Sequence, residues 1–110
     1  MSKAETERTK GLRRAILRVL AACQGDRYEG WLTERSLFAV LAASAPGLTM
    51  ADQSAACQYL ASKGKEYIEN RARQESKFDV KDADWRILPR GVDLLDETIP
   101  PDPGVEDNRQ

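Results

Sequence analysis

The feature of this chain that most constrains its fold is a helical pattern that stops at a glycine and turns directly into a strand pattern. Thr49 can cap the start of a helix, and Asp52 follows three residues later, as in a capping box. An apolar face continues at helical spacing to Leu60, and Gly64 can adopt the left-handed conformation that ends a helix. The pattern therefore predicts one helix over residues 49–63.

A strand is predicted immediately after this helix, because the period of the sequence changes to two. Residues 66–73 alternate as a strand does, and Tyr67 or Ile68 is expected to enter the core. Residues 81–84 are interpreted as a polar kink, and residues 85–88 as the strand that returns beside the first. Together these segments predict a β-hairpin.

Two further helices are predicted before this unit, and a short one after it. Apolar residues recur at spacings of three and four over residues 9–23, and a second helix is expected from Thr33 to about residue 44. Pro89 opens a final helix over residues 90–97, since proline is favoured in a first turn. The predicted core cluster consists of Ile16, Leu20, Leu37, Leu41, Cys57, Leu60, Ile68 and Leu95.

Three helices followed by a hairpin is the order of elements in a winged helix. We therefore predict an α+β fold with a three-helix helix–turn–helix core, a β-hairpin wing and a short C-terminal helix. A brief first strand is expected at Trp31 or Leu32. The domain is predicted to span residues 9–97, between a flexible N-terminus (1–8) and an acidic, proline-rich tail (98–110).

Composition narrows the classes of function. A chain of 110 residues suits one domain, and it contains neither an apolar run long enough to span a membrane nor a signal-peptide core, so we expect a cytoplasmic protein. With no histidine and two cysteines, Cys/His metal sites and histidine acid–base chemistry are excluded. Cys23 and Cys57 are interpreted as small apolar residues. No motif indicates an enzyme, a cofactor or a metal.

The charge is unevenly distributed, although the net charge is only −1. Residues 1–24 contain six basic and two acidic side chains, whereas residues 91–110 contain six acidic and one basic. Such asymmetry permits contact with nucleic acid. Alternatively, the basic patch serves solubility and pairs with acids of the tail, which could fold over it as an autoinhibitory segment. Ile99 and Val105 are the only plausible anchors of that tail.

The chain resembles the winged helix–turn–helix proteins of Mu-like bacteriophages and prophages over about residues 9–97. The segments that carry the resemblance are residues 13–20 (RRAILRVL), Leu48-Thr49, the helix end from Tyr59-Leu60 to Lys63-Gly64, and residues 88–95 (LPRGVDLL). The resemblance implies a small DNA-binding or transcription-associated protein of phage or prophage origin in a bacterial host. Such domains also dock proteins, so an adaptor in phage morphogenesis or DNA packaging, without DNA binding, is the alternative.

If the protein binds double-stranded DNA, the third helix, the wing and the first helix are expected to supply the contacts. The candidate DNA-binding residues are Lys10, Arg13, Arg14, Ser54, Gln58, Tyr59, Ser62, Lys63, Arg71, Arg73 and Lys77. The third helix carries no arginine or lysine before Lys63, so its outward face is equally consistent with a solvated or protein-packing surface. Because one module offers little basic surface, a homodimer is expected. In the adaptor alternative, Tyr59, Ala55 and Ser62 form the contact face.

Overall fold

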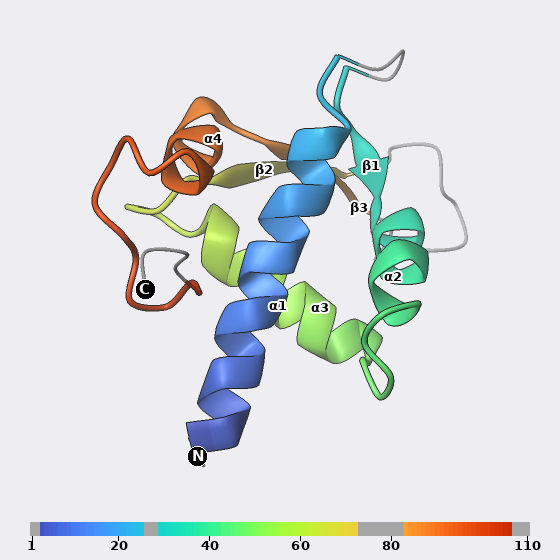
Figure 1. Ribbon diagram of the computed structural model, residues 1–110. Coiled ribbons are helices and arrows are strands. Elements are labelled where there is room, and N and C mark those ends of the chain that lie inside the picture. The colour runs from blue at the N-terminus through green and yellow to red at the C-terminus, as the bar shows by residue number, and fades with distance from the viewer. Residues whose placement is uncertain (1–2, 26–28, 73–82, 107–110) are drawn as a thin grey trace.

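The computed structural model describes residues 3–25, 29–72 and 83–106. Over these ranges four helices and a small three-stranded antiparallel sheet form an α+β fold (Figure 1). The elements in chain order are α1 (Lys3–Ala22), β1 (Leu32–Thr33), α2 (Glu34–Ala42), α3 (Met50–Ala61), β2 (Ile68–Ala72), β3 (Ala83–Ile87) and α4 (Pro89–Leu95). None of these helices is long and apolar enough to cross a membrane.

The helix that the sequence predicted most sharply, α3, begins and ends as its local chemistry requires. The Thr49 side chain accepts a hydrogen bond from the Asp52 backbone N–H at 3.1 Å, which satisfies one of the free donors at the helix start. The helix ends at Ala61, and Gly64 has a φ of 91°, so it takes the left-handed conformation in the turn toward β2. The predicted switch from helix to strand is confirmed in type, but α3 ends at Ala61 rather than at residue 63, and β2 begins at Ile68 rather than at residue 66.

The other helices agree with the predictions in type but differ at their ends. Thr33 caps α2 by accepting from the Ser36 N–H, and α2 ends at Ala42, two residues before the predicted end. Helix α1 begins at Lys3, six residues before the predicted start. Its first turns contain Ala, Glu, Lys and Arg, which favour helix without contributing to an apolar stripe, so periodicity alone could not detect them.

The sheet has the strand order β1-β3-β2, so the returning strand lies in the middle. Leu32 pairs with Trp85 on one side of β3, and Ile68 pairs with Ile87 on the other. The interpretation of residues 81–84 as a polar kink was wrong for Ala83 and Asp84, which belong to β3. A charged residue is tolerated inside the sheet there because Arg71 Nη2 donates to Asp84 Oδ2 at 3.0 Å. Residues 81–82 lie outside the described residues.

The core lies where α1, α2, α3, the sheet and α4 meet, and seven of the eight predicted members are buried in one cluster. The exception is Leu95, which only packs against the cluster while its neighbour Leu94 is buried. Helix α1 also buries Leu17 completely, because it contacts α2, α3, α4 and β3 and so presents apolar residues to several elements. Figure 1 shows α1 crossing the molecule in front of α3 and the sheet.

Candidate nucleic-acid interface

Helix α3 presents two distinct faces. Its buried side consists of Gln53, Ala56, Cys57 and Leu60, as the sequence predicted. Burial raises the pKa of the Cys57 thiol to about 12, with a smaller contribution from the charge of Glu34, so this cysteine stays protonated and inert at neutral pH.

The outward side of α3 is exposed and nearly neutral. Gln58 is exposed, and its Nε2 lies 3.5 Å from the Ser54 Oγ one turn earlier. The Ser62 Oγ donates to the Tyr59 carbonyl at 2.6 Å, so this hydroxyl contributes to the end of its own helix. Lys63 is exposed and is the first basic residue after the helix starts. This face offers amide and hydroxyl groups for base edges but little charge for phosphates.

Tyr59 lies at the edge of that outward face and is held from both sides. Its hydroxyl donates to Asp102 Oδ1 at 2.8 Å. The Arg13 guanidinium lies over its ring at 3.6 Å from the centroid, and the Lys65 ammonium lies 4.9 Å from the same centroid. Cations at these distances are attracted by the ring face. Tyr59 is therefore a structural link between α1, α3 and the tail rather than a freely projecting side chain.

Asp102, in the tail, is a buried carboxylate with a complete set of donors. Tyr67 donates its hydroxyl to Oδ2 at 2.8 Å, the Gly104 N–H donates to Oδ1 at 2.7 Å, and the Lys65 Nζ lies 3.3 Å from Oδ2. Burial by itself would raise the pKa of Asp102, but hydrogen bonds from Gly104, Tyr67, Tyr59 and Lys65 together hold it below its ordinary value. We call this cluster of Asp102, Tyr59, Tyr67, Lys65 and Gly104 the Asp102 anchor.

The same contacts raise the pKa of two of the partners, Tyr67 and Lys65. Desolvation, reinforced by the hydrogen bond to Asp102, raises the pKa of Tyr67. Hydrogen bonds to Tyr59 and Asp102 raise the pKa of Lys65. These shifts keep Asp102 as an anion, Lys65 as an ammonium and Tyr67 as a neutral hydroxyl throughout the neutral range.

Two arginines of α1, Arg13 and Arg14, contact the tail. Arg13 Nη1 donates to the Gly104 carbonyl at 2.9 Å, and Arg14 Nη1 donates to the Glu106 carbonyl at 3.2 Å. The Glu106 N–H in turn donates to the Lys10 carbonyl at 3.2 Å. The tail does fold over the basic patch, but these arginines bond its backbone carbonyls, whereas its buried carboxylate is bound by tyrosines and Lys65.

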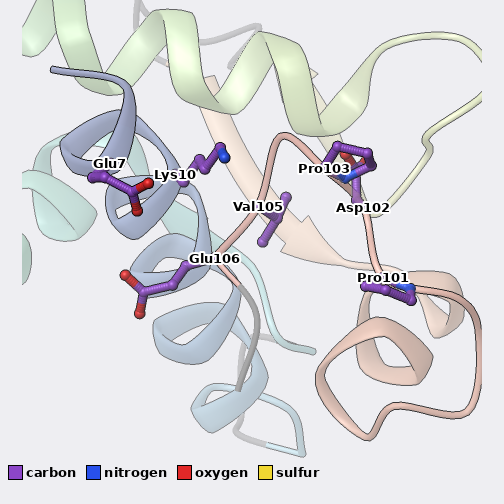
Figure 2. A pocket seen from close by; sticks show the side chains of 7 residues that line it. All are labelled: Glu7, Lys10, Pro101, Asp102, Pro103, Val105 and Glu106. Carbon is purple, nitrogen blue, oxygen red and sulfur yellow. The ribbon is translucent and has the colours of Figure 1, made fainter. Parts of the chain in front are cut away.

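An open hollow of about 460 Å³ lies beside the tail at the N-terminal half of α1. Figure 2 shows the tail passing between α1 and α3, with Glu7 and Lys10 on the α1 side of the hollow. The lining residues are Glu7, Lys10, Pro101, Asp102, Pro103, Val105 and Glu106. Val105 is only 5% exposed and joins the core, as predicted for an anchor of the tail.

On the β2–β3 hairpin, strand β2 presents an arginine, Arg71, that is already paired. Arg71 pairs with Asp84, and its guanidinium lies 4.3 Å from the centroid of the Trp31 ring. Its side chain remains 53% exposed. Arg73 and Lys77, the other candidate residues of the wing, lie outside the described residues.

The predicted site residues thus divide by location. Ser54 and Gln58 lie on the outward side of α3, and Ser62 and Lys63 follow its end, while Arg13, Arg14, Lys10 and Tyr59 meet at the seam between α1, α3 and the tail. Arg71 lies on β2, and Arg73 and Lys77 lie outside the described residues. The candidate residues chosen from the sequence do not include the other polar members of that seam, which are Asp102, Gly104, Lys65 and Tyr67. From the sequence, Asp102 is expected only as one of the tail acids that could pair with the arginines of α1. The one local signal was the Asp-Pro-Gly run at residues 102–104, a turn sequence in which an aspartate bonds a backbone N–H two residues ahead.

The geometry offers no evident centre for metal chemistry, since within the described ranges no group of three or more acidic or cysteine side chains could hold an ion. No family model, curated protein or solved structure matches the chain.

Proposed function

We propose that this chain is a winged-helix domain that binds double-stranded DNA through α3 and the β2–β3 hairpin. The observation that carries the proposal is the order of the elements, in which a helix–turn–helix pair, α2 and α3, is followed directly by an antiparallel hairpin. Strand β1 pairs with the returning strand β3, which ties the hairpin to the helical core. In such domains the second helix of the pair enters the major groove.

The exposed chemistry of α3 supports base contact more than strong phosphate binding. An exposed glutamine such as Gln58 can pair with an adenine edge, and Lys63 can reach a phosphate. Because few cations are free on this surface, we expect weak affinity that falls steeply with salt and that gains from a homodimer. The proposal extends to a transcription-associated role for a phage or prophage protein in the bacterial cytoplasm, as the sequence resemblance implies.

The test is the affinity for duplex DNA, measured by fluorescence anisotropy between 25 and 200 mM salt. The parent protein is expected to bind at low salt, and Lys63→Glu is expected to weaken binding because it reverses the exposed charge at the end of α3. Arg18→Glu is the matched control, since it makes the same reversal at an exposed position of α1. Gln58→Ala should change the preference among sequences and leave the salt dependence intact. Absence of binding to any duplex at the lowest salt, both by the parent and by variants in which residues 100–106 are released from α1, would overturn the proposal.

A second candidate, a protein adaptor without DNA binding, is favoured by a separate observation. Val40 and Met50 are large apolar side chains that are 52% and 41% exposed, and Ala55 and Ser62 make the outward side of α3 small and neutral. Because the tail holds Tyr59, the contact face of an adaptor would consist of Val40, Met50, Ala55 and Ser62, and Tyr59 would not belong to it. If no duplex is bound, a phage-encoded partner captured by the parent and lost in Val40→Glu would support this candidate.

A further inference from the structure

We propose that the tail segment 100–106 is autoinhibitory: it occupies an anion-binding seam between α1 and α3 that contacts DNA phosphates when the segment is released. This inference rests on the proposed function and adds regulation to it. The segment contributes the carboxylate bound in the Asp102 anchor, and its backbone carbonyls accept hydrogen bonds from Arg13 and Arg14 of α1.

The groups that hold Asp102 are of the kind that bind a phosphate oxygen. Two tyrosine hydroxyls reach different oxygens of the carboxylate, each at 2.8 Å, and the Lys65 ammonium lies at 3.3 Å. Hydroxyl, ammonium and guanidinium donors are the usual partners of DNA phosphates, and none of them distinguishes a carboxylate from a phosphate by charge. The docked aspartate therefore occupies the position that a backbone phosphate would take.

Docking of the tail also removes cations from the surface. Arg13 and Arg14 donate to carbonyls of the segment, and Lys65 is paired with Asp102. These three side chains would become available to phosphates once the segment leaves. Each phosphate neutralised adds about 0.9 to the slope of log affinity against log salt, so release of the tail has a measurable signature apart from affinity.

The seam lies beside the proposed reading face. Tyr59 belongs to α3, four residues after Ala55 and three before Ser62, both of which are exposed on that face. Residues at these spacings are neighbours on a helix surface. A DNA backbone that follows α3 therefore meets the tail, and the two compete for the same side of the helix.

The way in which the tail is held allows it to leave without unfolding the core. Its contacts are mostly polar, Val105 is its one buried apolar side chain within the described residues, and the open hollow beside it shows that it is not closely packed along α1. Gly104 is the tightest point, because a Cβ there would lie 1.9 Å from the Tyr59 hydroxyl and 3.1 Å from Arg13 Nη1. Any side chain at this position must displace the segment or Tyr59.

The experiment compares the full-length parent with Asp102→Asn and Gly104→Val in the same anisotropy titrations. Asp102→Asn removes the anion, and Gly104→Val expels the segment by steric conflict. Both variants are expected to bind duplex DNA on the order of tenfold more tightly. The slope of log affinity against log salt should become steeper by the amount that about one to three additional phosphate contacts produce. Asp96→Asn is the matched control, because it makes the same change of charge at an exposed position and should behave as the parent.

A synthetic peptide of residues 98–110, added to Gly104→Val, should weaken DNA binding again, whereas the same peptide with asparagine at position 102 should not. This arm stays informative if one variant is poorly folded, since Asp102→Asn can serve as the acceptor.

Parent-like affinity and salt slope in both variants would overturn the autoinhibition and leave DNA binding in place. If neither the parent nor any variant binds a duplex at low salt, the proposed function and this inference both fail.

Discussion

The apolar core and the Asp102 anchor are both buried, but they are stabilised in opposite ways. The core consists of side chains such as Ile16, Leu37 and Leu60, which are fully buried. They stabilise the folded state in proportion to the apolar area that folding removes from water. The anchor buries a carboxylate, which is favourable only because every oxygen finds donors. The core should therefore be insensitive to pH and salt, and the anchor should respond to both.

The two regions also differ in how far they reach along the chain. The stripes of the core repeat every three or four residues within one helix, whereas Asp102 bonds tyrosines that are 43 and 35 residues away. A segment held mainly by such long-range polar contacts can detach while the helices stay folded. The comparison thus separates the apolar contacts that stabilise the domain from the polar contacts that hold the tail against it.

The largest effect is expected from truncating the core at Leu60. Leu60→Ala leaves a cavity where α3 meets the other elements, and it should lower the free energy of unfolding by about 2–5 kcal/mol. Urea denaturation followed by far-UV circular dichroism measures the change. Val40→Ala, at an exposed position, should stay within about 0.5 kcal/mol. An unchanged midpoint for Leu60→Ala would show that this stripe does not carry the stability of the domain.

A comparison of two helical glycines separates close packing from helix propensity. A Cβ at Gly91 in α4 would lie 2.3 Å from the Tyr67 carbonyl, so Gly91→Ala should cost about 1–3 kcal/mol through forced displacement. Gly11 in α1 is the control. Its nearest neighbour is a flexible Glu106 oxygen at 3.3 Å, so Gly11→Ala should be neutral or stabilising by up to about 1 kcal/mol. Equal effects at both positions in thermal unfolding would contradict the close approach at Gly91.

The pH dependence of the tail is the next test of the comparison. The pKa of Asp102 is lower in the folded protein than in the unfolded chain. Its contribution to the stability of the docked tail is therefore present above the unfolded pKa of about 3.9 and is lost as pH falls through the folded pKa. The amide proton of Gly104, which donates to Asp102, should therefore shift in NMR spectra below about pH 4. Core amides of α3 should remain protected at that pH. A Gly104 amide that shifts identically in Asp102→Asn would show that another group causes the change.

The smallest effect is expected at Lys65, whose side chain is 32% exposed in its pair with Asp102. Lys65→Gln should lower the free energy of unfolding, measured by urea denaturation, by at most about 1 kcal/mol. Lys63→Gln, at a nearby exposed position, should leave it unchanged. The pKa of Lys65 is higher in the folded protein than in the unfolded chain. Its contribution to the free energy of unfolding is therefore present below the unfolded pKa of about 10.4 and is lost as pH rises through the folded pKa. A cost at Lys65 that persists unchanged above that range would point to lost packing over Tyr59 rather than lost charge.

The sequence by itself determined the order and type of the elements, because their signals are local. Thr33 and Thr49 cap helices within three residues, and Gly64 takes the left-handed conformation in the turn that follows α3. Apolar spacing also identified the buried side of α3 and most of the core. It missed the early start of α1, where the residues favour a helix but form no apolar repeat in the sequence.

Only the tertiary structure decided what the candidate site residues do. Arg13 and Arg14 reach carbonyls 91 and 92 residues away. The charge asymmetry of the sequence suggested pairing of these arginines with acids of the tail, but it could not predict that backbone carbonyls of the tail would accept their hydrogen bonds. Asp84 reads as part of a polar turn until β3 pairs on both sides and Arg71 supplies its partner. Burial of a charge depends on which donors the fold brings to it from distant segments. A local pattern carries no information on those donors, whereas the apolar stripe of a helix is complete within the helix itself.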